Sequence, residues 1–410
     1  MGDCDGNGQV TVDEVVQGVN IALASAGLED CGAFDANGDG RVTVEELVGA
    51  VTNALVGCAL RTPTATPSAT PSPMASATPG PPALTLVDMK EDGVDGVEGI
   101  AQAISVVISR DGAHVYVAGQ GSRGIAVFRR DPHTGTLAFV EAELSENGVA
   151  GVAQPTRLAL SPDDAHLYVG NGSAGMAVFR RDVMTGSLAI VQELPDITLN
   201  GFVISPDGAH VHGTSGNVVL RRDSASGTLT VIEKSETAFA FGWSLAISPD
   251  GTSVYRTDPY GGPFVAFRRD PASGHLTMVQ VLTGAGAAEA VVSPDGAHVY
   301  ATLWRKNAVV VFQRDATTGT LSFAEQHDGL RAAGAIAISP DGAQVYAGRQ
   351  IPLQIVMFGR DATTGRLTFL SAHDTFPHSD VKSIAVSPDS NYVYVAGGNS
   401  VLTFRVNRDL

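Results

Sequence analysis

The sequence predicts an all-β seven-bladed propeller preceded by a small N-terminal α-helical domain. A Ser-Pro-Asp-Gly segment recurs seven times, intact or with one substitution, and its copies begin at Ser109, Ser161, Ser205, Ser248, Ser293, Ser339 and Ser387. Successive serines are 43 to 52 residues apart, which is the length of a four-stranded propeller blade. With 47 glycines and only 17% charged residues, the composition is typical of a turn-rich β protein. The helical domain is predicted from two acidic loops near the N-terminus.

The net charge of −17 is unevenly distributed, because residues 1–60 contain ten acidic residues and a single arginine. This balance argues against nucleic-acid binding, which requires a basic stripe. No run of residues is long and apolar enough to cross a membrane. The three cysteines, Cys4, Cys31 and Cys58, all lie in the acidic segment. One disulfide and one free thiol is the simplest arrangement, but three pairings and a fully reduced state stay open.

The two acidic loops have the twelve-residue pattern of a calcium-binding loop. Each has oxygen-bearing side chains at positions 1, 3 and 5, glycine at position 6 and glutamate at position 12. Position 7 binds through its backbone carbonyl, so Gln9 and Arg41 can stand there. The sequence therefore predicts two Ca²⁺ sites, with the ligands Asp3, Asp5, Asn7, Gln9, Thr11 and Glu14 in the first, and Asp35, Asn37, Asp39, Arg41, Thr43 and Glu46 in the second.

A helix is predicted behind each calcium loop, because apolar residues recur there at helical spacing. They are Val12, Val15, Val16, Val19 and Leu23 in the first copy, and Val44, Leu47, Val48, Val51 and Leu55 in the second. We expect the two helices to pack face to face. Residues 2–58 thereby resemble a dockerin, a duplicated EF-hand-type calcium-loop-and-helix module of extracellular bacterial proteins. The resemblance implies calcium binding and a scaffold protein as partner, although loop positions 10 and 11, often Ser or Thr in cohesin-binding members, are Val12-Asp13 and Val44-Glu45.

Residues 61–82 are predicted to be a linker between the N-terminal domain, 1–60, and the propeller, 83–410. From Thr62 onward the segment is rich in threonine and proline and has no charged residue. Proline at this density favours polyproline II, so the linker spans up to about 60 Å. Such linkers suit exported modular proteins, and we therefore expect an extracellular or periplasmic location. We interpret the lack of a signal peptide before Gly2 as a truncated start.

Each propeller repeat contains four short segments of β-strand pattern. Around Ser293 they are 290–292, 298–302, 309–313 and 321–325, separated by turns rich in Pro, Asp-Gly and Thr-Gly. The chain stops after the third strand of the last repeat, 401–406, while an extra strand, 83–88, precedes the first repeat. We expect this extra strand to complete the last blade and close the ring.

The repeat unit resembles that of the lactonase-type seven-bladed propellers, a family that includes 6-phosphogluconolactonases. The likeness rests on Asp-Gly-Ala-His-Val-Tyr-Val at 111–117, on the following Ala-Val-Phe-Arg-Arg-Asp and on Thr-Gly-Thr-Leu, and it spans residues 83–410. It implies the propeller fold and lactone hydrolysis. Family members commonly have Pro-Arg-His or Pro-His-His where a blade begins, and the nearest match here is Gln154-Pro155-Thr156-Arg157.

The repeated residues are interpreted as structural. The Ser-Pro-Asp-Gly corners and the Arg-Arg-Asp turns should share one face of the propeller, with the arginines in exposed ion pairs. One histidine position recurs as His114, His166, His210 and His298, and we expect exposed strand residues there rather than metal ligands.

The candidate catalytic residues are those that break the repeat on the opposite face. Four residues before the serine, most copies have Ser, Gly or Ala, but two have Arg157 and Glu289. His327 and Arg331 lie nearby in the sequence on the same face, as do the large loop residues Trp243, Trp304, Arg305 and Arg349. Hydrolysis of a lactone needs a general base for the water and a cation for the oxyanion. Glu289 or His327 could supply the base, and Arg157 or Arg331 the cation.

These features leave the enzyme question open between two functions. The leading prediction is an exported calcium-binding modular protein whose propeller binds a small molecule, a carbohydrate or a protein partner. The alternative is a lactone hydrolase that acts at the variable face. A scaffold partner bound through the N-terminal domain is compatible with both.

Overall fold

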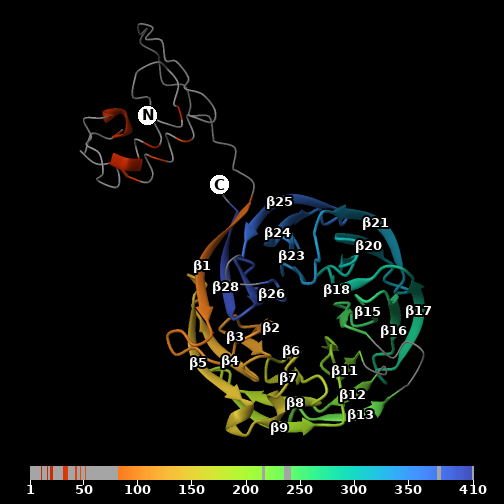
Figure 1. Ribbon diagram of the computed structural model, residues 1–410. Helices are drawn as coiled ribbons and strands as arrows, with labels where there is room; N and C mark the ends of the chain where they lie inside the picture. Colours follow the sequence, from red (N-terminus) through yellow and green to blue (C-terminus); the bar gives the residue numbers. More distant parts are fainter. Residues whose placement is uncertain are drawn as a thin grey trace, which may run out of the picture. The chain divides into compact units, whose positions relative to one another are not determined.

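The computed structural model describes residues 82–408, apart from 215–217, 235–241 and 376–379, and scattered positions between 11 and 51. The chain divides into two compact units, Met1–Ala77 and Thr78–Leu410. In the second unit, seven four-stranded antiparallel sheets surround a central channel (Figure 1). The predicted all-β seven-bladed propeller is therefore confirmed. Among the described residues, no helix is long and apolar enough to span a membrane.

Blades 1 to 6 each consist of four strands that follow one another in the chain, from the channel outward. Blade 1 has β2 (Ala103–Ile108), β3 (His114–Gly119), β4 (Gly124–Arg130) and β5 (Leu137–Leu144); blade 2 has β6 (Arg157–Leu160), β7 (His166–Gly170), β8 (Met176–Arg181) and β9 (Leu188–Leu194); blade 3 has β10 (Phe202–Ile204), β11 (His210–Gly213), β12 (Val219–Arg222) and β13 (Leu229–Glu233). Blade 4 has β14 (Ser244–Ile247), β15 (Ser253–Thr257), β16 (Phe264–Arg269) and β17 (Leu276–Leu282); blade 5 has β18 (Ala287–Val292), β19 (His298–Leu303), β20 (Ala308–Arg314) and β21 (Leu321–Asp328); blade 6 has β22 (Ile336–Ile338), β23 (Gln344–Gln350), β24 (Leu353–Arg360) and β25 (Leu367–Asp374). Two short 3₁₀ turns, η3 (Ser145–Asn147) and η4 (Ala150–Val152), connect blades 1 and 2.

Blade 7 joins the two ends of the propeller. It consists of β26 (Ser383–Val386), β27 (Tyr392–Gly397), β28 (Ser400–Asn407) and, as its outer strand, β1 (Ala83–Glu91). β1 pairs antiparallel with β28 from Ala83 opposite Asn407 to Glu91 opposite Ser400. This pairing satisfies the backbone groups of β28 that would otherwise form an open edge.

The core lies between neighbouring blades. In six of the seven blades the second strand is buried along its whole length, because both of its faces are covered by adjacent blades. In blade 6 the last two residues of β23, Arg349 and Gln350, are half-buried. Six tyrosines are fully buried at one repeat position of this strand, namely Tyr116, Tyr168, Tyr255, Tyr300, Tyr346 and Tyr394. Burial of large aromatic side chains at each blade interface supplies much of the hydrophobic stabilisation of the ring.

Each Ser-Pro-Asp-Gly corner also connects its blade to the next through an arginine, whose side chain is buried in six of the seven cases and exposed at Arg408. Between blades 1 and 2, the Nη2 atom of Arg181 lies 3.0 Å from Asp111 Oδ2 and 2.9 Å from His114 Nδ1. Arg181 Nε donates to the hydroxyl of Tyr116, which donates in turn to the carbonyl of Gly186, both at 2.8 Å. A Cβ at Gly186 would lie 2.2 Å from the His114 ring, so only glycine allows this approach.

The same aspartate–arginine pair recurs at all seven blade interfaces. The nitrogen–oxygen distances are 2.5 to 3.0 Å, in the pairs Asp111–Arg181, Asp163–Arg222, Asp207–Arg269, Asp250–Arg314, Asp295–Arg360, Asp341–Arg408 and Asp389–Arg130. We call each pair an interblade joint. Partial burial alone would raise the pKa of Asp207, but hydrogen bonds from Ser205 and Ala209 and the Arg269 ion pair lower it to about 2. The aspartates are therefore charged at neutral pH.

The joints correct two predictions made from the repeat. The second arginine of each Arg-Arg-Asp turn, predicted to form an exposed ion pair, is buried in all four turns, in blades 1 to 4. The four histidines predicted to be exposed are also buried, and burial beside an arginine lowers their pKa values, at His114, His166, His210 and His298. Both sites lie beneath the neighbouring blade, which covers positions that an isolated sheet would expose.

The joint between blades 3 and 4 is incomplete. Its tyrosine position is occupied by His212, which is fully buried. Among the described residues, neither ring nitrogen of His212 has a hydrogen-bond partner, and Arg269 Nε has none either. Burial, followed by the charge of Arg269 and by His210, lowers the pKa of His212 to about 3, and Asp207 opposes this only weakly. Unpaired buried polar groups are costly, so these three atoms should weaken this joint.

We expect His212→Tyr to stabilise the propeller. A tyrosine hydroxyl could accept from Arg269 Nε, as Tyr168 accepts from Arg222 Nε at 2.7 Å in the preceding joint. The free energy of unfolding should rise by about 1–3 kcal/mol, measured by urea denaturation. His212→Phe, which fills the space without a hydroxyl, is the matched control and should gain less. Equal or lower stability of His212→Tyr would contradict this account of the joint.

The gain from His212→Tyr should depend on pH. In the unfolded chain the histidine pKa is near 6.5, whereas in the folded protein it is about 3. Between these values the unfolded state binds a proton that the folded state does not, so falling pH destabilises the wild type by about 1.4 kcal/mol per pH unit. Tyrosine does not titrate there. The stability difference between variant and wild type should therefore widen from pH 7 to pH 4, and a constant difference would contradict the buried neutral histidine.

The first unit is described only in part. It includes η2 (Gly32–Phe34), and helical backbone at residues 16, 19–21, 47 and 51. Cys31 is disulfide-bonded, and it is buried with Phe34 against Ile21, Val42 and Leu47. Val16, Val19 and Val51 are exposed, contrary to the predicted face-to-face packing. Of the residues in this cluster, Leu47 is one of the predicted packing residues, whereas Ile21 is not.

The predicted calcium loops fall largely outside the described residues. Of their ligands, the structure describes Thr11, Asp35 and Thr43. Within the described part of the chain, no group of three His, Cys, Asp or Glu side chains could hold a metal ion. The two calcium sites and the helical calcium-binding domain therefore stay predictions.

Candidate functional site

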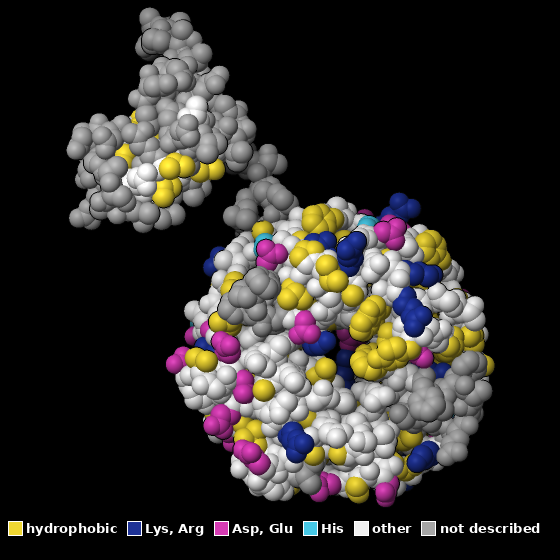
Figure 2. Space-filling model, in the orientation of Figure 1, with side chains coloured by type: hydrophobic (Ala, Val, Ile, Leu, Met, Phe, Trp, Pro, Cys, Tyr) yellow, Lys and Arg dark blue, Asp and Glu magenta, His cyan; other side chains and the backbone are white. Residues whose placement is uncertain are grey.

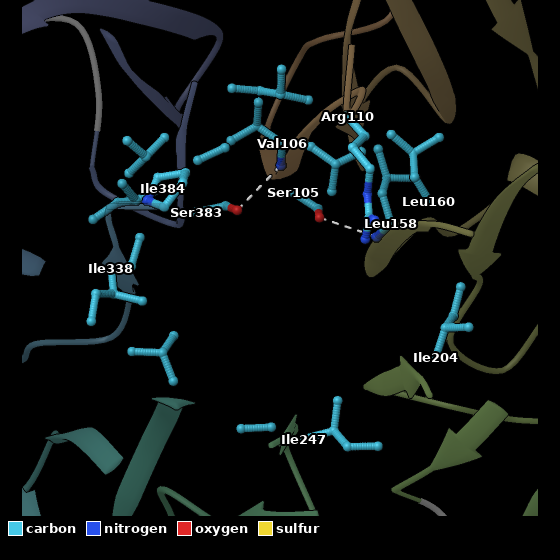
Figure 3. A pocket seen from close by; sticks show the side chains of 18 of the residues that line it. Ser105, Val106, Arg110, Leu158, Leu160, Ile204, Ile247, Ile338, Ser383 and Ile384 are labelled. Carbon is cyan, nitrogen blue, oxygen red and sulfur yellow. Dashed lines mark hydrogen bonds between the residues drawn. The ribbon is translucent and has the colours of Figure 1, made fainter. Parts of the chain in front are cut away.

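The candidate site lies in the central channel of the propeller, a cavity of about 890 Å³ lined by the innermost strand of each blade. Most of the wall is aliphatic, because the residue before each Ser-Pro-Asp-Gly serine points inward (Figure 3). This ring consists of Ile108, Leu160, Ile204, Ile247, Val292, Ile338 and Val386. Ser105 and Ser383 also line the channel. The Ser105 hydroxyl accepts a hydrogen bond from the backbone N–H of Leu158, and the Ser383 hydroxyl accepts one from the backbone N–H of Val106.

Arg157 and Glu289 form an ion pair in this channel. Arg157 begins β6 of blade 2 and Glu289 lies in β18 of blade 5, and both residues line the cavity. Arg157 Nη1 lies 2.5 Å from Glu289 Oε1. Because blades 2 and 5 are far apart in the ring, the pair reaches across the opening, where Figure 2 shows basic and acidic side chains together. The side chains of Arg157 and Glu289 are 33% and 13% exposed, so solvent reaches the pair.

Several contacts fix the orientation of Glu289. Its second carboxylate oxygen accepts the backbone N–H of Ile336 at 3.1 Å, and its own N–H donates to Thr302 Oγ1 at 3.2 Å. β18 has a register shift between Ala287 and Ala290, a local irregularity of the kind that re-aims side chains near functional sites. The backbone of blade 6 thus holds the carboxylate, and the Thr302 hydroxyl in β19 holds the backbone of Glu289.

The other end of the channel has a second break in the repeat, which the sequence interpretation overlooked. Arg110 replaces the proline of the corner, and Asp164 replaces the glycine with a positive φ of 62°. Both line the channel, and Asp164 Oδ2 accepts the backbone N–H of Arg110 at 3.0 Å. The Arg110 side chain points into the channel (Figure 3). The signal in the sequence that could have found this site is the loss of the repeated proline at Arg110.

His327 and Arg331, the other predicted catalytic residues, do not line the channel. His327 lies on β21, the outermost strand of blade 5, where its Nε2 atom is 3.1 Å from Glu325 Oε1 and its ring packs on Phe358. Arg331 is exposed in the loop after β21, and its carbonyl accepts the N–H of Gln350. Of the four predicted residues, the structure brings together only Arg157 and Glu289.

The ion pair combines the two groups that ester hydrolysis requires. A carboxylate can take a proton from water, and a guanidinium can stabilise an oxyanion. Among the described residues, Arg157 Nη1 is bonded to Glu289 and the other N–H groups of Arg157 have no partner. They are therefore available to a ligand carbonyl at the same place.

Comparison with known proteins shows the family of the propeller. The family model described as "Lactonase, 7-bladed beta-propeller" matches residues 83–204 and 278–381, together more than half of the chain. A curated relative, the 6-phosphogluconolactonase of Bacillus subtilis, is 33% identical over 92 residues, which are 22% of this chain and 25% of that protein. The chain thus spans a quarter of the length of this relative.

Solved structures share the fold at lower identity. The periplasmic gluconolactonase of Pseudomonas aeruginosa has a TM-score of 0.60 and 22% identity, with 76% of this chain and 95% of that chain covered. Hydrazine synthase of Kuenenia stuttgartiensis has a TM-score of 0.59 and 19% identity, with 78% and 99% covered. Likeness at this identity concerns the fold alone, since the second protein has an unrelated name and activity.

The family match overturns the leading functional prediction. A calcium-binding modular protein whose propeller only binds a partner is not supported, because the matched family and the curated relative are lactonases. The alternative, a lactone hydrolase, is favoured in its place. The chain belongs to the lactonase family of seven-bladed β-propellers.

Proposed function

We propose that the protein hydrolyses a lactone at the Arg157–Glu289 pair. The observation that carries this proposal is the position of the pair: these are the two charged residues that replace small ones at one repeat position, and they meet in the channel of a lactonase-family propeller. A carboxylate and a guanidinium at equivalent positions of distant blades are not part of the structure that the blades share. Their meeting is therefore better explained by chemistry than by folding.

The reaction assigns one role to each side chain. Glu289 accepts a proton from a water molecule whose oxygen attacks the lactone carbonyl carbon. Arg157 donates to the carbonyl oxygen and stabilises the negative charge that develops there. When the tetrahedral intermediate collapses, the bond between the carbonyl carbon and the ring oxygen breaks, and the ring oxygen takes the proton from Glu289. The product is the open hydroxy acid, which ionises to a carboxylate beside Arg157.

The resting ion pair prepares this arrangement. Arg157 binds one Glu289 oxygen and the Ile336 N–H binds the other, so the carboxylate is already oriented before the substrate arrives. Preorganised groups cost no reorientation during the reaction.

The test is the rate at which glucono-δ-lactone opens in a pH-stat, corrected for spontaneous hydrolysis. The wild type should accelerate opening, and the Arg157→Ala, Glu289→Ala double variant should not. Arg331→Ala removes an arginine of the same face that does not line the channel, and it should keep the wild-type rate. Equal rates for wild type and double variant would refute the proposed activity, and loss of activity in Arg331→Ala alone would refute the assigned residues.

A further inference from the structure

Blades 4 and 5 have three exposed aromatic side chains on the face of the candidate site. Trp243 precedes β14, Tyr260 lies in the turn between β15 and β16, and Trp304 follows β19. They are 43%, 66% and 42% exposed. In Figure 2 hydrophobic side chains gather beside the central opening, on the side of β15 and β18. Trp243 and Trp304 are the two tryptophans of the chain.

We call these three residues, together with Arg305, the aromatic rim. The rings of Trp243 and Tyr260 meet edge to face, with centroids 5.8 Å apart. Arg305 lies against the turn that holds Tyr260, since a Cβ at Gly261 would be 3.9 Å from Arg305 Nη1. Arg305 follows Trp304 directly, so the surface runs from blade 4 to blade 5.

The aromatic rim adjoins, along the strands, the backbone positions that carry the candidate site. Trp243 is followed by Ser244, which occupies in blade 4 the repeat position of Glu289 in blade 5. Trp304 follows Leu303, which pairs with Ala287 two residues before Glu289. A ligand group attached to a lactone at Glu289 would therefore meet the rim as it leaves the channel.

The chemistry of the rim fits a sugar ring. Exposed Trp and Tyr rings offer flat apolar faces with polar edges, and a pyranose has apolar C–H faces and hydroxyl edges. Arg305 adds donors for hydroxyl oxygens. The lactone ring itself would be bound at Arg157 and Glu289. A sugar ring stacked on the rim would therefore be a second sugar unit of the same substrate.

Resting on the proposed function, we infer that the substrate is a glycosyl aldonolactone: a lactone ring that binds at Glu289, with at least one further sugar unit stacked on the aromatic rim. Such a substrate must be supplied by a two-electron oxidation of the hemiacetal at the reducing end of an oligosaccharide. Hydrolysis then yields the glycosyl aldonate.

Kinetics on two lactones tests the inference. The wild type should open the lactone of a β-1,4-linked disaccharide with a kcat/KM about tenfold above that for glucono-δ-lactone. Trp304→Ala and Trp243→Ala should each raise the KM for the disaccharide lactone and so lose this preference. Both variants should keep the wild-type rate on glucono-δ-lactone. Phe323→Ala, which removes an exposed aromatic ring from outer strand β21, is the matched control and should keep the preference. Equal kcat/KM for the two lactones in the wild type would overturn the inference.

Tryptophan fluorescence gives a readout that does not depend on activity. Both tryptophans lie in the rim, so titration with the open disaccharide aldonate should change the emission, whereas gluconate should not. A saturable change in a protein that opens no lactone would support the rim and refute the proposed function. No change with the aldonate, or a change that depends only on protein concentration and so reports a protein partner, would overturn the inference.

Discussion

Glu289→Gln should lower the rate of lactone opening by about 100-fold or more, the usual contribution of a general base. Glutamine has nearly the same shape and can still accept the N–H of Ile336, but it cannot take a proton from water. The loss should appear in kcat, because the binding contacts are kept. Initial rates over a range of lactone concentrations separate kcat from KM.

The controls for this prediction follow from the geometry. Glu233→Gln changes a glutamate of outer strand β13, which pairs with His275, and should keep the wild-type rate. Because Glu289 and Arg157 act as a unit, the Glu289→Gln, Arg157→Gln double variant should be scarcely slower than the worse single variant. A Glu289→Gln protein with wild-type kcat would show that another group is the base.

Arg181→Ala should destabilise the propeller by about 3 kcal/mol, since it removes one partner of a buried pair. The Arg181 side chain is fully buried and contacts Asp111, Asp164, Tyr116 and His114. Its removal would take one hydrogen-bond donor from each of these four groups at the interface between blades 1 and 2. Urea denaturation followed by circular dichroism measures the free energy of unfolding.

The adjacent arginine provides the control for this prediction. Arg180 lies in the same strand, β8, but it is exposed. Arg180→Ala should change the stability by less than about 0.5 kcal/mol. Equal effects of the two substitutions would contradict the distinction between joint and surface arginines.

The sequence predicted the blades because the fold is itself a repeat. A period near 45 residues with a turn motif in each copy requires that number of equivalent sheets, and the structure confirms seven. The same repeat made Arg157 and Glu289 visible as exceptions. Residues equivalent by sequence occupy equivalent places in the ring, so two exceptions at the channel-lining position could meet there.

Other features could not be derived, because they depend on contacts between blades. The burial of His114 and Arg181 results from the packing of one blade on the next, and no local pattern encodes it. Likewise, the Ser-Pro-Asp-Gly aspartate was interpreted as a turn residue, yet it also binds an arginine about 60 residues distant in the chain, as Asp207 binds Arg269. His327 was placed on the correct face, but its strand lies at the outer edge of the blade.

The most direct test of catalysis at Arg157 and Glu289 is a crystal structure of the Glu289→Gln variant soaked with glucono-δ-lactone. The account predicts a lactone at the channel mouth, with its carbonyl oxygen hydrogen-bonded to Arg157 and its carbonyl carbon facing the side chain of residue 289. A lactone bound elsewhere on the propeller, with the Arg157 guanidinium still hydrogen-bonded to the side chain of residue 289, would contradict the account.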